Sequence, residues 1–65
     1  MYVYDIRQDG DKIIVTDDKQ EKFVIAEGIS SFIGPDLSGS GKYEYSKEGH
    51  FYMWDPKTNT TEMVQ

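Results

Sequence analysis

The stretch from Tyr43 to Val64 constrains the fold most strongly, because it combines dense aromatic content with turn-forming residues. It holds five of the nine aromatic residues of the chain and the single Trp. Glu48 and Gly49 lie between two aromatic-rich runs, and an acidic residue followed by Gly suits a two-residue hairpin turn, because Gly adopts positive φ without a Cβ clash. We therefore predict two antiparallel strands, at about 43–46 and 50–54.

This turn decides which side chains share a face. Side chains alternate along a strand, so one face collects four rings in two cross-strand pairs, Tyr43 with Trp54 and Tyr45 with Tyr52. Residues 56–59 begin with Pro and end with Asn, which favours a second turn and a strand at 60–64 that adds Met63 to the rings. The opposite face carries Glu44, Ser46, Phe51, Met53, Glu62 and Val64. A shift of one residue would put Glu62 among the rings, so the pattern favours this register.

The N-terminal half reads as a three-stranded meander, with strands at about 2–7, 12–16 and 22–26. A turn at Asp9-Gly10 pairs Ile6 with Ile13 and Tyr4 with Val15. A three-residue connection then sets Phe23 opposite Val15 and Ile25 opposite Ile13. The predicted core face of the meander is Tyr2, Tyr4, Ile6, Ile13, Val15, Phe23 and Ile25.

The segment between the two halves completes the predicted fold. Residues 29–33 suit one helical turn with Ile29, Phe32 and Ile33 on one side, and residues 34–42 have the composition of a flexible loop. The chain is thus predicted to be all-β, with about six short antiparallel strands in a small barrel or a meander sandwich. The element order is similar to that of oligonucleotide-binding (OB-like) barrels, and the tight meanders suggest an SH3-like barrel equally well.

The size of the chain limits what it can bury. Its 65 residues suffice for a single domain, 1–65, and a domain of this size buries about 60% of its unfolded surface. Without Cys, it has no disulfide to brace the fold. The longest apolar runs have four residues, too few for a membrane span or a signal peptide. Since Met1 leads directly into a strand pattern, we expect a complete cytoplasmic polypeptide.

Three patterns that invite a chemical interpretation are incomplete. Residues 39–42, Gly-Ser-Gly-Lys, lack the leading Gly of a phosphate-binding loop, because Asp36 stands there, and no Ser or Thr follows the Lys. His50 is the single His in a chain without Cys, which leaves no nucleophile and base set. The Asp pairs within 9–11 and 17–18 lack the closing Glu of a calcium loop. We therefore predict no enzymatic activity, no cofactor and no metal site.

Six apolar residues fall outside the predicted core faces: Val3, Ile14, Val24, Phe51, Met53 and Val64. Any of them left exposed would form an apolar patch ringed by acidic residues, which is typical of a protein interface or a self-association surface. The formal net charge is −5, with twelve acidic against seven basic residues, and this balance repels phosphate backbones and anionic lipid but attracts basic partners.

We therefore predict a small acidic protein-binding module that uses this patch or a free strand edge to bind a partner with a basic surface. One form of this hypothesis is an inhibitor of a nucleic-acid-handling protein, of the kind that phages encode. The alternative is a single-stranded nucleic-acid-binding barrel that stacks bases on its aromatic strands. The Lys and Arg residues are scattered among more numerous Asp and Glu residues and form no positive groove, so nucleic acid is the less favoured partner.

Overall fold

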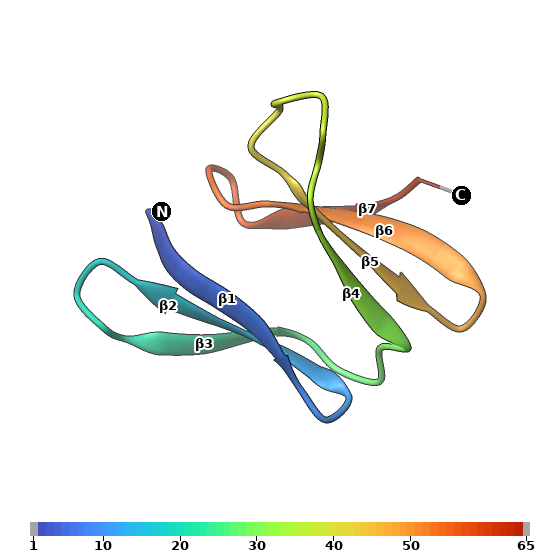
Figure 1. The fold of residues 1–65 in the computed structure, drawn as a ribbon, viewed down its shortest axis with the longest axis horizontal. Coiled ribbons are helices and arrows are strands. Elements are labelled where there is room, and N and C mark those ends of the chain that lie inside the picture. The colour runs from blue at the N-terminus through green and yellow to red at the C-terminus, as the bar shows by residue number, and fades with distance from the viewer. Residues whose placement is uncertain (1, 65) are drawn as a thin grey trace.

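The computed structural model describes residues 2–64, which form seven antiparallel strands in two sheets (Figure 1). Met1 and Gln65, the ends of the predicted domain, lie outside the described residues. The first sheet has the order β1-β2-β3 and the second the order β4-β5-β6-β7. The strands are β1 (Val3–Asp9), β2 (Lys12–Asp17), β3 (Lys22–Ala26), β4 (Ser31–Pro35), β5 (Tyr43–Lys47), β6 (His50–Asp55) and β7 (Thr60–Met63).

The register predicted for the C-terminal half is confirmed. Tyr43 lies opposite Trp54, Tyr45 opposite Tyr52, and Tyr52 opposite Met63. Both residues of the β5–β6 turn have positive φ, 52° at Glu48 and 80° at Gly49, which is the turn geometry that matches the right-handed twist of a hairpin. The turn residues of this half therefore encoded its pairing directly.

The core lies where the aromatic face of β5 and β6 meets the first sheet. The buried hydrophobic residues are Ile13, Val15, Ile29, Tyr45 and Trp54. The ring centroids of Tyr45 and Tyr52 are 5.5 Å apart and those of Tyr43 and Trp54 are 6.1 Å apart, within the range of favourable aromatic pairs. The buried indole is satisfied, because Trp54 Nε1 donates to Asn59 Oδ1 at 3.0 Å.

The predicted register of the first hairpin is wrong by two residues. Ile6 lies opposite Val15, not Ile13, because the turn is formed by Gly10 and Asp11 instead of Asp9 and Gly10. Gly10, with φ of 63°, occupies the first turn position, which suits a two-residue turn as well as the predicted placement does. A shift of two residues keeps every side chain on its face, so the hydrophobic pattern could not separate the two registers.

β-Bulges account for the errors in the predicted core face. Tyr4 is an extra residue in β1, because Val3 pairs with Asp17 while Asp5 pairs with Thr16. The bulge turns Val3 toward the core and leaves Tyr2 and Tyr4 exposed. In β3 the predicted pair of Val15 with Phe23 is confirmed, but an extra residue at Ile25 sets Ala26 opposite Ile13.

The helical turn predicted at 29–33 does not form, and strand β4 takes its place. Ile29 is buried as expected, and its N–H donates to the Asp11 carbonyl at 2.9 Å. Phe32 pairs with Tyr45 in the sheet, and its N–H donates to Gln8 Oε1 at 3.1 Å. Ile33 is the extra residue of another bulge and is 51% exposed. Pairing with β5 satisfies backbone groups that one isolated helical turn would leave open.

The sheets do not close into a barrel. β1 and β4 lie against one another without forming a ladder, and the Gln8 side chain spans the gap between them. β4 also takes up Gly34 and Pro35, so the connection to β5 is shorter than the predicted loop 34–42. Within residues 2–64 no helix is long and apolar enough to cross a membrane.

Truncating a core residue tests where the core lies. Ile13 is fully buried, so Ile13→Val is expected to lower the free energy of unfolding by about 0.5–1.5 kcal/mol in urea titrations followed by Trp54 fluorescence. The matched change Ile33→Val, at the exposed bulge, is expected to cost less than about 0.5 kcal/mol. Equal losses from the two variants would contradict the assigned core.

The β5–β6 turn provides a second stability test. At Gly49 an added Cβ would meet no atom within 4 Å, so Gly49→Ala perturbs the backbone conformation alone. With φ of 80°, the substitution is expected to lower the free energy of unfolding by about 1–2 kcal/mol. Glu48→Asn is expected to raise stability, because Asn tolerates positive φ better than Glu does. A neutral Gly49→Ala would show that the turn has another geometry.

Candidate functional site

The six apolar residues predicted to form an interface do not share one surface. Phe51, Met53 and Val64 lie together on the outer face of β6 and β7, the face turned away from the core. Ile14 and Val24 pair on the outer face of the first sheet. Val3 packs against the core. The structure thus divides the predicted interface into two separate groups and removes one member.

The first group forms what we call the acid-flanked patch, which consists of Phe51, Met53 and Val64 with the carboxylates of Glu44, Asp55 and Glu62. Phe51 is 39% exposed and Val64 52% exposed, and they are adjacent because the Val64 N–H donates to the Phe51 carbonyl at 2.7 Å. Met53 lies between Glu44 on β5 and Glu62 on β7. The patch is therefore apolar at its centre and negative on both sides.

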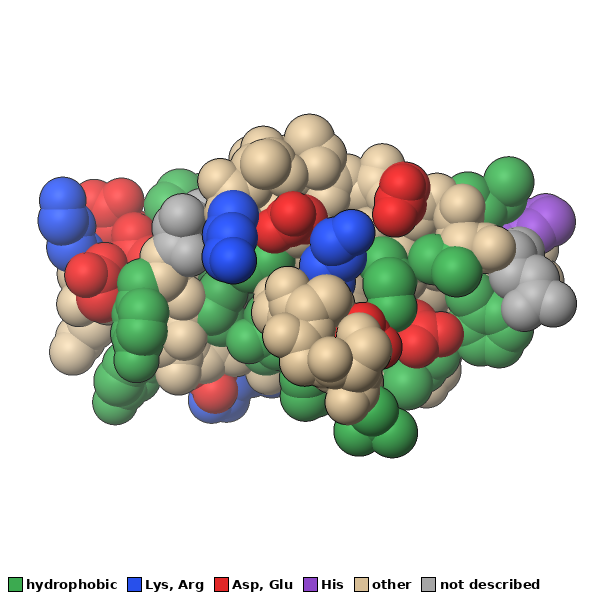
Figure 2. Space-filling model, turned by 90° about the horizontal axis from the view of Figure 1, so that it is seen from above, with side chains coloured by type: hydrophobic (Ala, Val, Ile, Leu, Met, Phe, Trp, Pro, Cys, Tyr) green, Lys and Arg blue, Asp and Glu red, His purple; other side chains and the backbone are tan. Residues whose placement is uncertain are grey.

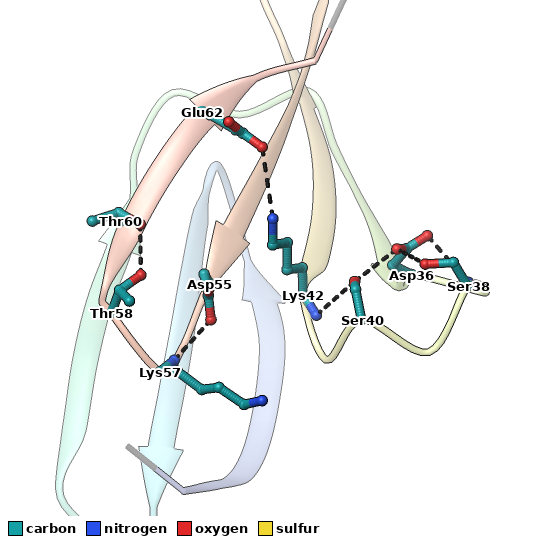
Figure 3. Close-up of polar contacts among 9 residues, drawn as sticks. All are labelled: Asp36, Ser38, Ser40, Lys42, Asp55, Lys57, Thr58, Thr60 and Glu62. Carbon is teal, nitrogen blue, oxygen red and sulfur yellow. Dashed lines mark hydrogen bonds and ion pairs between the residues drawn. The ribbon is translucent and has the colours of Figure 1, made fainter.

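A hollow of about 250 Å3 opens within the patch. Its walls are Lys42, Met53, Asp55, Thr60, Thr61 and Glu62. Lys42 reaches across it toward β7, with its Nζ 3.7 Å from Glu62 Oε1, as Figure 3 shows. The Glu62 side chain is 70% exposed, so this ion pair is loose and open to exchange with another cation.

The connection between β4 and β5 holds Lys42 in place. The Asp36 N–H donates to the Lys42 carbonyl at 2.8 Å, which extends the β4–β5 hairpin by one pair. The Asp36 carboxylate accepts hydrogen bonds from the hydroxyls of Ser38 and Ser40, the latter at 2.7 Å (Figure 3). The Ser38 hydroxyl, the Ser40 hydroxyl and the Ser38 N–H lower the pKa of Asp36 below its ordinary value of 3.8.

The outer face of the first sheet has a larger hollow of about 890 Å3. Its walls include Tyr4, Ile14, Thr16 and Lys22, together with an ion pair in which Arg7 Nε lies 2.8 Å from Asp5 Oδ2. Opposite charges here neutralise one another, so this face presents no single chemistry to a partner.

The His and Asp residues of the incomplete chemical patterns lie at turns and strand ends. Among residues 2–64 no group of three or more His, Asp or Glu side chains could hold a metal ion. His50 is exposed at the start of β6, beside the turn. Asp17, from one of the Asp pairs, uses Oδ1 to accept the N–H groups of Lys19 and Glu21 at 2.9 Å, so it stabilises a turn.

Sequence reasoning placed Glu44 and Glu62 beside the apolar residues but missed Asp55, Lys42 and the hollow. The predicted strand ends at residue 54, whereas β6 continues through Asp55 and points its side chain to the outer face. Asp55 Oδ1 also accepts the Lys57 N–H at 2.9 Å, so the same carboxylate stabilises the following turn. Lys42 reaches the patch because the hairpin extends to Asp36, a pairing that the loop composition concealed. If the alternation of the strand had been extended by one residue, it would have placed Asp55 on the outer face. No local sequence pattern indicates that Lys42 reaches the patch.

The loop that positions Lys42 is tested by titrating Asp36. The pKa of Asp36 is lower in the folded chain than in the unfolded chain, so its ionised carboxylate stabilises the fold at any pH above the unfolded pKa. This stabilisation is lost as the pH falls through the pKa of the folded chain. In NMR titrations Asp36 is expected to protonate below 3.8, and the double change Ser38→Ala with Ser40→Ala is expected to raise its pKa toward that value. An unchanged pKa in the double variant would contradict the hydroxyl contacts.

Comparison of the chain with models of known protein families, with curated proteins and with solved structures finds no match. What the protein does must therefore be inferred from its own surface.

Proposed function

We propose that this protein is a non-enzymatic binding module whose acid-flanked patch recognises a partner protein with a basic, partly apolar surface. The observation that carries the proposal is the adjacency of exposed Phe51 and Val64 on a face where Met53 lies between two carboxylates. An exposed apolar patch with a charged rim is typical of an interaction site.

The two chemistries of the patch have separate roles in this proposal. Burial of the exposed parts of Phe51 and Val64 supplies affinity, at about 25 cal/mol for each Å2 of apolar surface removed from water. The rim carboxylates and the net charge of −5 attract a cationic partner and raise its association rate. Figure 2 shows acidic and apolar side chains interspersed over one face of the molecule, with Lys or Arg side chains among them.

Proteins that handle nucleic acid fit this description of a partner, because they present Lys and Arg to phosphates. Carboxylates on Glu44, Asp55 and Glu62 would occupy such a surface in place of phosphate groups. Bound there, the module would act as an inhibitor. This is the narrower form of the proposal, and it depends on the patch being the contact surface.

Single-stranded nucleic acid is less compatible with the structure as a partner. Stacking needs accessible rings, yet Tyr45 and Trp54 are buried and Tyr43 and Tyr52 are half-buried against the core. The exposed side of the same strands carries carboxylates, which repel phosphates.

A selection from random peptides displayed on a surface tests the proposal without a known partner. Peptides that bind are expected to combine Lys or Arg with apolar residues. Val64→Ser is expected to weaken the best peptide by about tenfold or more, because the Val side chain would be buried in the complex. The control is Val24→Ser, on the outer face of the other sheet, where the Val is 49% exposed and no loss is expected.

Charge is tested on the same complex. Glu62→Gln is expected to weaken binding and to reduce its dependence on salt. Selection of no saturable peptide, or equal losses from Val64→Ser and Val24→Ser, would contradict the proposal.

A further inference from the structure

Strand β7 is the terminal strand best suited to accept another strand. Of the four terminal strands in the two sheets, β1, β3 and β4 each carry a bulge, at Tyr4, Ile25 and Ile33 respectively. Bulges disrupt the row of backbone groups that a further strand would need. β7 pairs with β6 without any register shift and contains no Pro, Gly, Lys or Arg. Of the devices that protect a sheet edge, Thr60–Met63 has only its short length of four residues and the charge of Glu62, and that charge attracts a basic strand.

The free backbone groups of β7 can be identified from its pairing with β6. The hydrogen bond from the Val64 N–H to the Phe51 carbonyl marks this pair as a hydrogen-bonded one. Hydrogen-bonded pairs alternate along an antiparallel ladder, so Glu62 and Thr60 also face β6. The N–H and C=O groups of Thr61 and Met63 therefore point to the open edge.

We propose that the partner enters as an extended basic segment that adds to β7 as a fifth, antiparallel strand of the second sheet. The inference deepens the proposed function and depends on it, because the acid-flanked patch continues to this edge through Glu62 and Val64. Main-chain hydrogen bonds to Thr61 and Met63 supply the contact, and alternate side chains supply the specificity.

Cross-strand rows specify the side chains of the added strand. On the outer face, the row of Glu44, Met53 and Glu62 calls for Lys or Arg next to Glu62, and the row of Phe51 and Val64 calls for an apolar residue. On the inner face, Met63 continues the row of Tyr45 and Tyr52 and is 60% exposed, so it calls for a second apolar residue.

The added strand runs antiparallel, so its sequence follows from these rows. It reads apolar opposite Val64, apolar opposite Met63, basic opposite Glu62, β-branched opposite Thr61 and basic opposite Thr60. Ile-Tyr-Lys-Val-Lys satisfies this order. The two basic side chains then lie over the hollow that Asp55 and Glu62 line.

Charge argues against a second copy of this chain as the occupant. If two copies paired through the free backbone groups of both Thr61 and Met63, Thr61 of each copy would lie opposite Met63 of the other. In this register the two Glu62 side chains, one from each copy, lie directly opposite one another. Like charges directly opposite one another destabilise a strand pair. A basic segment removes this repulsion and pairs Glu62 with an opposite charge.

The test uses peptides that contain the Ile-Tyr-Lys-Val-Lys core and differ in backbone N-methylation. The residues opposite Thr61 and Met63 share hydrogen bonds with β7, so N-methylation of either, the Val or the Tyr, is expected to weaken binding by at least about tenfold. N-methylation of the central Lys, whose N–H points away from β7, is expected to leave the affinity nearly unchanged. The reversed peptide, Lys-Val-Lys-Tyr-Ile, has the same composition and is expected to bind less tightly.

Two readouts on the protein itself complete the experiment. The unmodified peptide is expected to slow hydrogen exchange at the amides of Thr61 and Met63, with little change at Gly10, in the exposed turn of the other sheet. Lys42→Gln is expected to tighten peptide binding by up to about fivefold, because it frees Glu62 from its loose ion pair. A misfolded variant would lose affinity, so a gain in affinity cannot come from misfolding.

The outcomes separate the inference from the function on which it rests. If all methylated peptides bind equally while Val64→Ser still weakens binding, strand addition is wrong and the patch is a binding surface. If no peptide of either order binds, and none is selected from a random library, both proposals fail. Concentration-dependent dimerisation that protects Thr61 and Met63 without peptide would make a second copy the occupant and would overturn the inference.

Discussion

The fold depends on the contact between two rings of the second sheet, Tyr45 and Trp54, and two aliphatic side chains of the first, Ile13 and Val15. Together with Ile29, these are the buried hydrophobic residues of the described chain. Each sheet on its own would present one apolar face to water, so burying the two faces against one another stabilises both sheets. Burial also raises the pKa of Tyr45 above its ordinary value, because it disfavours the charged phenolate.

The small size of this contact explains why so much of the molecule stays available to partners. Three strands cannot cover four, so Met63 on the aromatic face is largely exposed, and no layer covers the outer face of β6 and β7. Most terminal strands are protected by bulges, and the bulges also carry Val3 and Ala26 into the core. β7 has no bulge, and it borders an outer face on which Met53 lies between two carboxylates.

Prediction from the sequence was reliable where turn chemistry permits one register. Glu48-Gly49 and the loop that ends at Asn59 admit one pairing, and the structure has it. Around Gly10 two turns are equally acceptable, one at Asp9-Gly10 and one at Gly10-Asp11. They differ in register by two residues, so every side chain stays on the same face of the sheet in both. The sequence pattern gave no signal for the bulges at Tyr4 and Ile33. Beside the second one, Phe32 bonds to Gln8, a contact between residues that are distant in sequence. The same kind of contact brings Lys42 to Glu62, so the candidate site was predicted in part: its apolar and acidic members were found, and its cation and hollow were not.

The central claim is that the outer face of β6 and β7 is the surface with which this protein binds. The most direct measurement is an NMR titration of the labelled protein with a basic, partly apolar peptide chosen by unbiased selection. The account predicts that the largest shift changes centre on Phe51, Met53, Glu62 and Val64. Changes centred on Ile14 and Val24, on the other sheet, would contradict it.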